Sequence, residues 1–73
     1  MTGAQSARIF IELNGEPRSV GSATVAALLR ELEVPVDRVA VEVDRRLVRR
    51  VDWETTPIVP GSRVEIVHFV GGG

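Results

Sequence analysis

The sequence contains no cysteine, no lysine and one histidine, and aromatic side chains make up 4% of its 73 residues. Without cysteine, the chain has no disulfide bonds and no thiolate metal sites. His68 alone supplies too few nitrogen ligands for a typical zinc or iron site. It also leaves little basis for nucleophilic catalysis by a Ser–His or Cys–His pair. These absences argue against a zinc or iron site and leave few candidate residues for an enzyme.

Charges of the two signs are almost balanced, with nine basic residues, ten acidic residues and a formal net charge of −1. This balance argues against a general affinity for nucleic acid phosphates. No apolar run approaches the length of a membrane span, and residues 1–7 lack the apolar stretch of a secretory signal. We therefore expect a cytoplasmic protein that binds neither nucleic acid nor membrane.

The chain length allows one small domain. Its apolar residues are mainly thirteen Val, four Ile and five Leu, and branching at Cβ favours strands. We expect residues 1–7 to form a flexible leader, residues 8–69 to form the domain and residues 70–73 to form a flexible tail.

Alternation of apolar and polar residues predicts strands at 8–13, 39–43 and 63–67. The pair Asn14-Gly15 tolerates the positive φ angles of a tight turn, so the first strand is expected to reverse and pair through residues 18–20. Pro17 lacks an amide donor and therefore belongs at the start or the edge of that second strand.

Two further turns are expected later in the chain. Asp44-Arg45-Arg46 is the expected turn into a short strand at 47–48, and Gly61 is expected to turn the chain into the last strand. Residues 52–60 have no clean period, and Trp53 within them is expected to close the core.

One helix is predicted between the second and third strands. Its apolar residues recur at i, i+3, i+4 and i+7 and form one stripe, at Val25, Leu28, Leu29 and Leu32. Ser22 or Thr24 is the expected N-cap, and Pro35 is expected to end the helix. The element order predicts an α+β fold with a mixed sheet of four to five strands, covered by this one main helix.

The last ten residues, Val-Glu-Ile-Val-His-Phe-Val-Gly-Gly-Gly at 64–73, closely resemble the C-terminus of the ThiS family, the sulfur carriers of thiamin biosynthesis. Further similarities lie at residues 14–16, 24–29 and 39–43 and at Trp53. The resemblance covers nearly the whole chain after residue 7 and implies the ubiquitin-like β-grasp fold. One departure is at residues 44–46, where such proteins often carry an Asn-Gly turn.

The resemblance also implies the chemistry of the tail. In this family, an ATP-dependent adenylating enzyme of the ThiF type converts the terminal carboxylate into an acyl-adenylate. Sulfur from a donor protein then displaces AMP and leaves a thiocarboxylate on the last residue, here Gly73, which a thiazole synthase of the ThiG type uses. The chain is then a carrier and not an enzyme, binds no cofactor and leaves ATP to its activating partner. Gly71, Gly72 and Gly73 are expected to enter a tunnel in a partner enzyme.

Apolar residues lead into this tail and predict a surface for docking partner enzymes. The predicted docking residues are Val67, His68, Phe69 and Val70. Val67 is expected to face away from the core, whereas Phe69 either docks partners or folds back over the edge of the core. His68 is expected to be solvated or part of an interface rather than catalytic.

Four arginines, at positions 45, 46, 49 and 50, flank the short strand at 47–48. The simpler interpretation is a solvated rim paired with Glu42, Asp44 and Asp52, and the alternative is a patch for an acidic partner.

Other functions remain open at this point. Within the carrier class, the alternatives are the small subunit of molybdopterin synthase and carriers for tRNA thiolation or cysteine synthesis. Ubiquitin-like conjugation to lysines would use the same activated Gly73. A non-covalent β-grasp binding module of the TGS type would make no use of the tail.

Overall fold

Two hairpins and one central strand that lies between them make up the sheet. The structure, a computed structural model, describes residues 7–69. Its elements in chain order are β1 (Ile9–Leu13), β2 (Glu16–Val20), α1 (Val25–Glu31), β3 (Val39–Val43), β4 (Arg46–Val48), the 3-10 turn η1 (Arg50–Asp52) and β5 (Arg63–His68). The strand order is β2-β1-β5-β3-β4, with β1 and β5 parallel and the other neighbours antiparallel. The predicted mixed sheet with one helix is confirmed.

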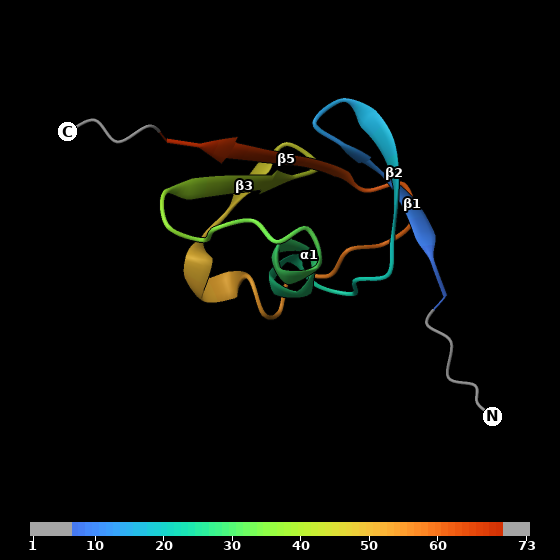
Figure 1. Ribbon diagram of the computed structural model, residues 1–73, viewed down its shortest axis with the longest axis horizontal. Helices are drawn as coiled ribbons and strands as arrows, with labels where there is room; N and C mark the ends of the chain where they lie inside the picture. The colour runs from blue at the N-terminus through green and yellow to red at the C-terminus, as the bar shows by residue number, and fades with distance from the viewer. Residues whose placement is uncertain (1–6, 70–73) are drawn as a thin grey trace.

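The helix and the segment after β4 lie on one side of the sheet (Figure 1). The core between them contains residues from β1, β3, β5 and α1, among them Ile11, Val41, Val64, Leu28 and Leu29. In Figure 1, β5 ends on the left and β1 begins on the lower right, so the two lie on opposite sides of the domain.

The first hairpin has the predicted turn. Asn14 and Gly15 adopt φ angles of 49° and 87°, which matches the twist of the flanking strands and aligns Leu13 with Glu16. Pro17 lies in β2, which is an edge strand. Because no strand lies on the outer side of β2, the missing amide proton of Pro17 removes no hydrogen bond there.

The second hairpin makes the same kind of turn without glycine. Asp44 and Arg45 adopt φ angles of 52° and 71°, a conformation that crowds Cβ against the backbone. Two hydrogen bonds to the neighbouring strand hold the turn. The Asp44 amide donates to the Arg63 carbonyl at 2.7 Å, and the Asp44 carboxylate accepts from the Arg63 amide at 2.9 Å.

Thr24, one of the two candidates, is the N-cap of α1. Its Oγ1 accepts a hydrogen bond from the Ala27 amide at 3.1 Å, which satisfies one of the free donors of the first turn. The predicted apolar stripe faces the sheet, since Val25, Leu28 and Leu29 are buried.

The helix ends earlier than the sequence predicts, so the expectation that Pro35 ends it is wrong. Glu33 adopts a φ of 57° directly after the C-cap. The Val34 amide then donates to Leu29 at 3.0 Å, and the Glu33 amide donates to Arg30 at 3.1 Å. These two bonds satisfy the last carbonyls of the helix in a Schellman arrangement. Glycine usually occupies this left-handed position, and its absence hid the boundary.

Trp53 closes the core, as expected. Its ring is buried, and its indole N–H donates to the Val48 carbonyl at 3.1 Å. The short turn η1, which precedes it, was not predicted.

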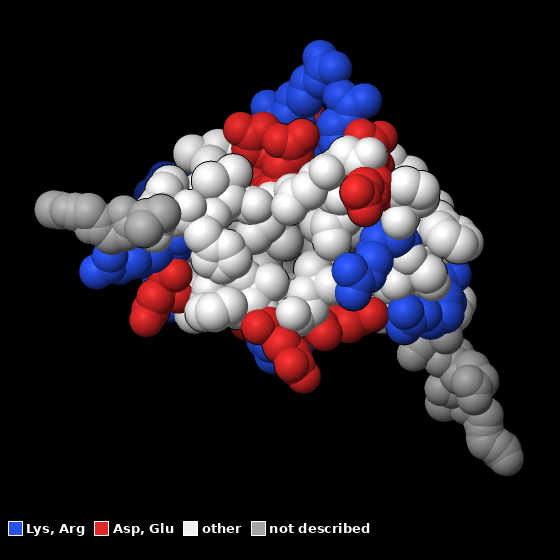
Figure 2. Space-filling view, turned by 45° about the horizontal axis from the view of Figure 1, so that its top comes forward, with Lys and Arg blue, Asp and Glu red and all other residues white. Residues whose placement is uncertain are grey.

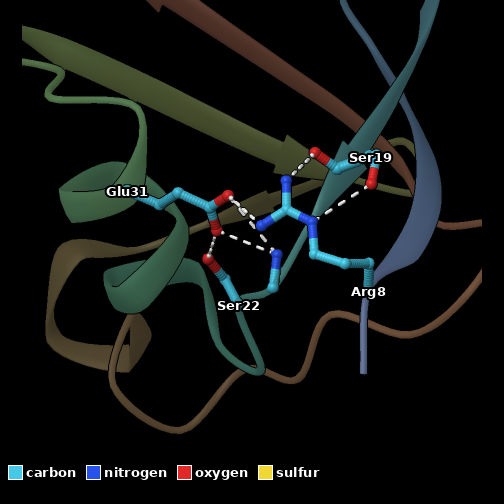
Figure 3. Close-up of polar contacts among 5 residues, drawn as sticks. Arg8, Ser19, Ser22 and Glu31 are labelled. Carbon is cyan, nitrogen blue, oxygen red and sulfur yellow. Dashed lines mark hydrogen bonds and ion pairs between the residues drawn. The ribbon is translucent and has the colours of Figure 1, made fainter. Parts of the chain in front are cut away.

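A polar cluster joins the start of β1 to the end of α1 (Figure 3). The Arg8 guanidinium donates to the Ser19 carbonyl at 2.8 Å and to the Glu31 carboxylate at 3.3 Å. Glu31 also accepts from the Gly21 amide at 3.0 Å and from the Ser22 hydroxyl. One carboxylate therefore joins three segments that are separate in the sequence.

We expect this cluster to make stability depend on pH. The Ser22 hydroxyl first, then the Gly21 amide and the charge of Arg8, lower the pKa of Glu31 below its ordinary 4.5, while desolvation opposes them. A lowered folded-state pKa means that the stabilisation is present above the unfolded pKa and is lost as the pH falls through the folded-state pKa.

Glu31→Gln should therefore lower the Tm at neutral pH. The difference in Tm between this variant and the wild type should close as the pH falls below about 4.5. Thermal unfolding between pH 3 and pH 7 measures this gap, with Glu16→Gln as the exposed control. A gap that stays constant to pH 3 would assign the effect to packing instead.

Candidate functional site at the end of β5

The last strand changes its neighbours along its length. Arg63 and Val64 pair with β1, whereas Val64–His68 pair with β3. Beyond Val64, β5 therefore has a strand neighbour on one side only.

Asn14 takes the place of β1 on the other side. Its side-chain oxygen accepts from the Ile66 amide at 2.8 Å, and its side-chain nitrogen donates to the Ile66 carbonyl at 3.3 Å. Its own backbone amide donates to Val64 at 2.9 Å. The primary amide of Asn carries both a donor and an acceptor, as a peptide group does. The sequence pattern predicted Asn14 only as a turn residue, and this role was not predicted. The one feature of the sequence that points to this pairing with β5 is that Asn, rather than Gly or Asp, occupies position 14.

The backbone of the sheet holds the chain through Phe69. The Phe69 amide donates to the Arg38 carbonyl at 2.8 Å, one residue beyond the last strand pair. Arg38 adopts a φ of 63° just before β3, in the left-handed conformation that non-glycine residues rarely adopt. The segment carrying Val67, His68 and Phe69 is therefore held at a defined place on the domain.

Two of the predicted docking residues are exposed. Val67 and Phe69 are 53% and 56% exposed, and Val67 lies opposite Ala40 on the sheet face that α1 does not cover. Phe69 is not part of the core, so the alternative in which it folds back is not observed. Phe69 instead lines a shallow hollow with Ala40, Leu47 and the buried Trp53.

His68 points to the other side of the strand, toward α1. It lines a separate hollow with Leu32, Val34 and Ile66. The structure therefore does not gather Val67, His68 and Phe69 on one face. The remaining predicted site residues, Val70, Gly71, Gly72 and Gly73, lie outside the described residues.

Two other features are not found within residues 7–69, a cluster of metal ligands and a membrane-spanning helix. No three side chains among His, Asp and Glu lie close enough together to hold a metal ion. No helix in this part of the chain is long and apolar enough to cross a membrane.

Comparisons with known proteins agree with this geometry. Residues 7–73 match the sequence profile of the ThiS family. The crystal structure of the thiamine biosynthesis protein ThiS from Geobacter metallireducens superposes with a TM-score of 0.78 at 32% identity, over 89% of this chain and 100% of that chain. The resemblance read from residues 64–73 and the predicted β-grasp fold are confirmed.

Two curated relatives are much longer proteins. The thiazole synthase of Paramagnetospirillum magneticum is 42% identical over 62 residues, which are 84% of this chain and 19% of that protein. The thiazole synthase of Magnetococcus marinus is 36% identical over 64 residues, or 86% of this chain and 20% of that protein. This chain therefore spans about a fifth of the length of these two relatives. In each of them, the matching sequence is one part of a longer polypeptide.

Proposed function

Because this chain belongs to the ThiS family, we propose that it is a sulfur carrier of thiamin biosynthesis, and a substrate of its partner enzymes rather than a catalyst. One observation carries the proposal. β5 is held to the sheet through Phe69, and the sequence places Gly71, Gly72 and Gly73 almost directly after it.

The chemistry proposed for Gly73 begins with its carboxylate. A carboxylate is a poor electrophile because its negative charge repels nucleophiles, so it needs a better leaving group. An adenylating enzyme of the ThiF type would supply one by forming an acyl-adenylate from ATP, with release of pyrophosphate. Sulfur delivered at the oxidation level of sulfide by a donor protein would then attack the carbonyl carbon, AMP would leave with the electron pair of its C–O bond, and a thiocarboxylate would remain.

Glycine suits the three tail positions for a steric reason. Without Cβ, it leaves both faces of the carbonyl open and accepts φ values that other residues refuse. Three glycines in a row therefore make a thin thread for a narrow partner tunnel. The partners hold ATP and the catalytic groups, so this chain itself needs no bound cofactor.

A thiazole synthase of the ThiG type is the proposed acceptor of the sulfur. The support is that the curated relatives named thiazole synthase contain a sequence like this one within a longer chain. Covalent linkage of the two parts in one polypeptide is consistent with their working together. All of these partners are proposed to meet the carrier in the cytoplasm.

Intact-protein mass spectrometry tests the proposal. The chain is incubated with ATP, the adenylating enzyme and the sulfur donor of its source organism, and its C-terminal peptide is then analysed. We expect the gain in mass that accompanies replacement of one oxygen by sulfur, confined to Gly73. An unmodified peptide, or conjugates through lysine isopeptide bonds instead of sulfur, would contradict the carrier role.

A further inference from the structure

Three arginines from two separate segments meet beside Phe69. They are Arg38, in the loop before β3, and Arg49 and Arg50, directly after β4. All three line the hollow that Phe69 borders, and all three are exposed. Figure 2 shows basic side chains gathered beside the end of β5, on the left of the view, with acidic side chains next to them. We call Arg38, Arg49 and Arg50 the arginine collar.

The arginine collar is not neutralised by ion pairs within residues 7–69. The salt bridges of this part of the chain are Arg8–Glu31, Arg30–Glu54 and Arg63–Glu12. The expected pairing of residues 45, 46, 49 and 50 with Glu42, Asp44 and Asp52 is not observed. Within residues 7–69, the side-chain contact found for the collar is that of Arg50, whose guanidinium lies 5.6 Å from the centre of the Trp53 ring.

The hollow also has an apolar part. Exposed side chains of Val36, Leu47 and Phe69 line it together with the arginines. An apolar centre with a charged rim, enriched in arginine and aromatic residues, is typical of protein–protein interfaces. The planar guanidinium binds carboxylates through two parallel hydrogen bonds. A nucleic acid is a poorer fit, because the chain carries a net charge of −1 and one exposed aromatic ring lies in the hollow.

We propose that the arginine collar docks on an acidic rim of Asp and Glu side chains around the tunnel of the thiazole synthase that receives the tail. The inference rests on the proposed function and adds the chemistry of the partner surface. The collar lies beside Phe69, the last residue that the structure describes, so pairing it with such a rim would bring the end of β5 to the tunnel entrance. The part of the interface over Phe69 and Leu47 would then exclude water.

Docking of the collar should depend on salt concentration through the association rate. Charges at the rim of an interface act mainly on the association rate, and salt screens them over about 10 Å. Reversing two collar charges should therefore slow association strongly at low salt and much less at high salt.

The test compares two double variants with the same change in charge. Arg38→Glu/Arg49→Glu reverses the collar but leaves Arg50 on Trp53. Arg45→Glu/Arg46→Glu reverses two exposed arginines at the opposite end of β3. Surface plasmon resonance measures binding to the thiazole synthase of the source organism. We expect the collar variant to bind about 100-fold more weakly at low salt, mainly through slower association, and the control to stay within about 3-fold of the wild type.

Two results would overturn the proposal. The collar variant binding as tightly as the wild type would exclude an acidic rim, and equal losses in both variants would show a general effect of net charge. Failure of the proposed function is a different result, because wild-type chain would then gain no sulfur in the mass-spectrometric assay. A wild type that gains sulfur, together with an unaffected collar variant, removes only the collar inference.

Discussion

Deletion of Gly73 is expected to abolish thiocarboxylate formation while leaving the domain folded. The deletion moves the terminal carbonyl back along the thread by about 3.3–3.6 Å. A displacement of about 1 Å at a reacting atom already costs about 100-fold in rate, so a shift of this size should remove activity from the assay, even though the new terminal residue, Gly72, is chemically the same.

The fold should not respond to this deletion. The described core lies between α1 and the sheet, and the last described hydrogen bond from the strand is that of Phe69. Mass spectrometry after incubation with ATP, the adenylating enzyme and the sulfur donor measures loading, and circular dichroism measures the Tm. Deletion of Thr2 is the matched control and should load normally. Loading of the shortened chain at the wild-type rate would show that the position of the terminal carbonyl is not what the partner recognises.

Leu28→Ala should have the largest effect on stability of the changes considered. Leu28 lies on α1 with 0% of its surface exposed, and truncation of a buried leucine to alanine costs about 2–5 kcal/mol. A domain of this size has a free energy of unfolding on the order of 5 kcal/mol. We therefore expect a fall in Tm of roughly 10–30 °C and a substantial unfolded fraction at 37 °C.

The control for this variant is the same substitution on the surface. Leu47 is 67% exposed, so Leu47→Ala should change the free energy of unfolding by less than about 0.5 kcal/mol. Urea denaturation of both variants gives the comparison. Equal losses would mean that Leu47 is covered in solution, for example by a second copy of the chain.

The helix and the strands were predictable because each has a local cause. The spacing of Val25, Leu28, Leu29 and Leu32 allows one amphipathic helix, and the alternation in residues 39–43 and 63–67 places every second side chain on one face. Asn14-Gly15 carries its turn geometry in the two residues themselves. Boundaries without a local signal were missed, as at Glu33, where a residue other than glycine adopts the left-handed conformation.

The sequence alone determined the class of fold, the family and the position of the glycines, because periodicity and a motif of consecutive residues are properties of neighbours along the chain. It did not determine which side chains meet across the sheet. The Asn14 amide that supports β5, the hollow that His68 shares with Leu32 and Val34, and the shared hollow of Arg38, Arg49 and Arg50 were decided by the tertiary structure. Each depends on strand order and register, which bring together residues far apart in the sequence, and no local pattern records that juxtaposition.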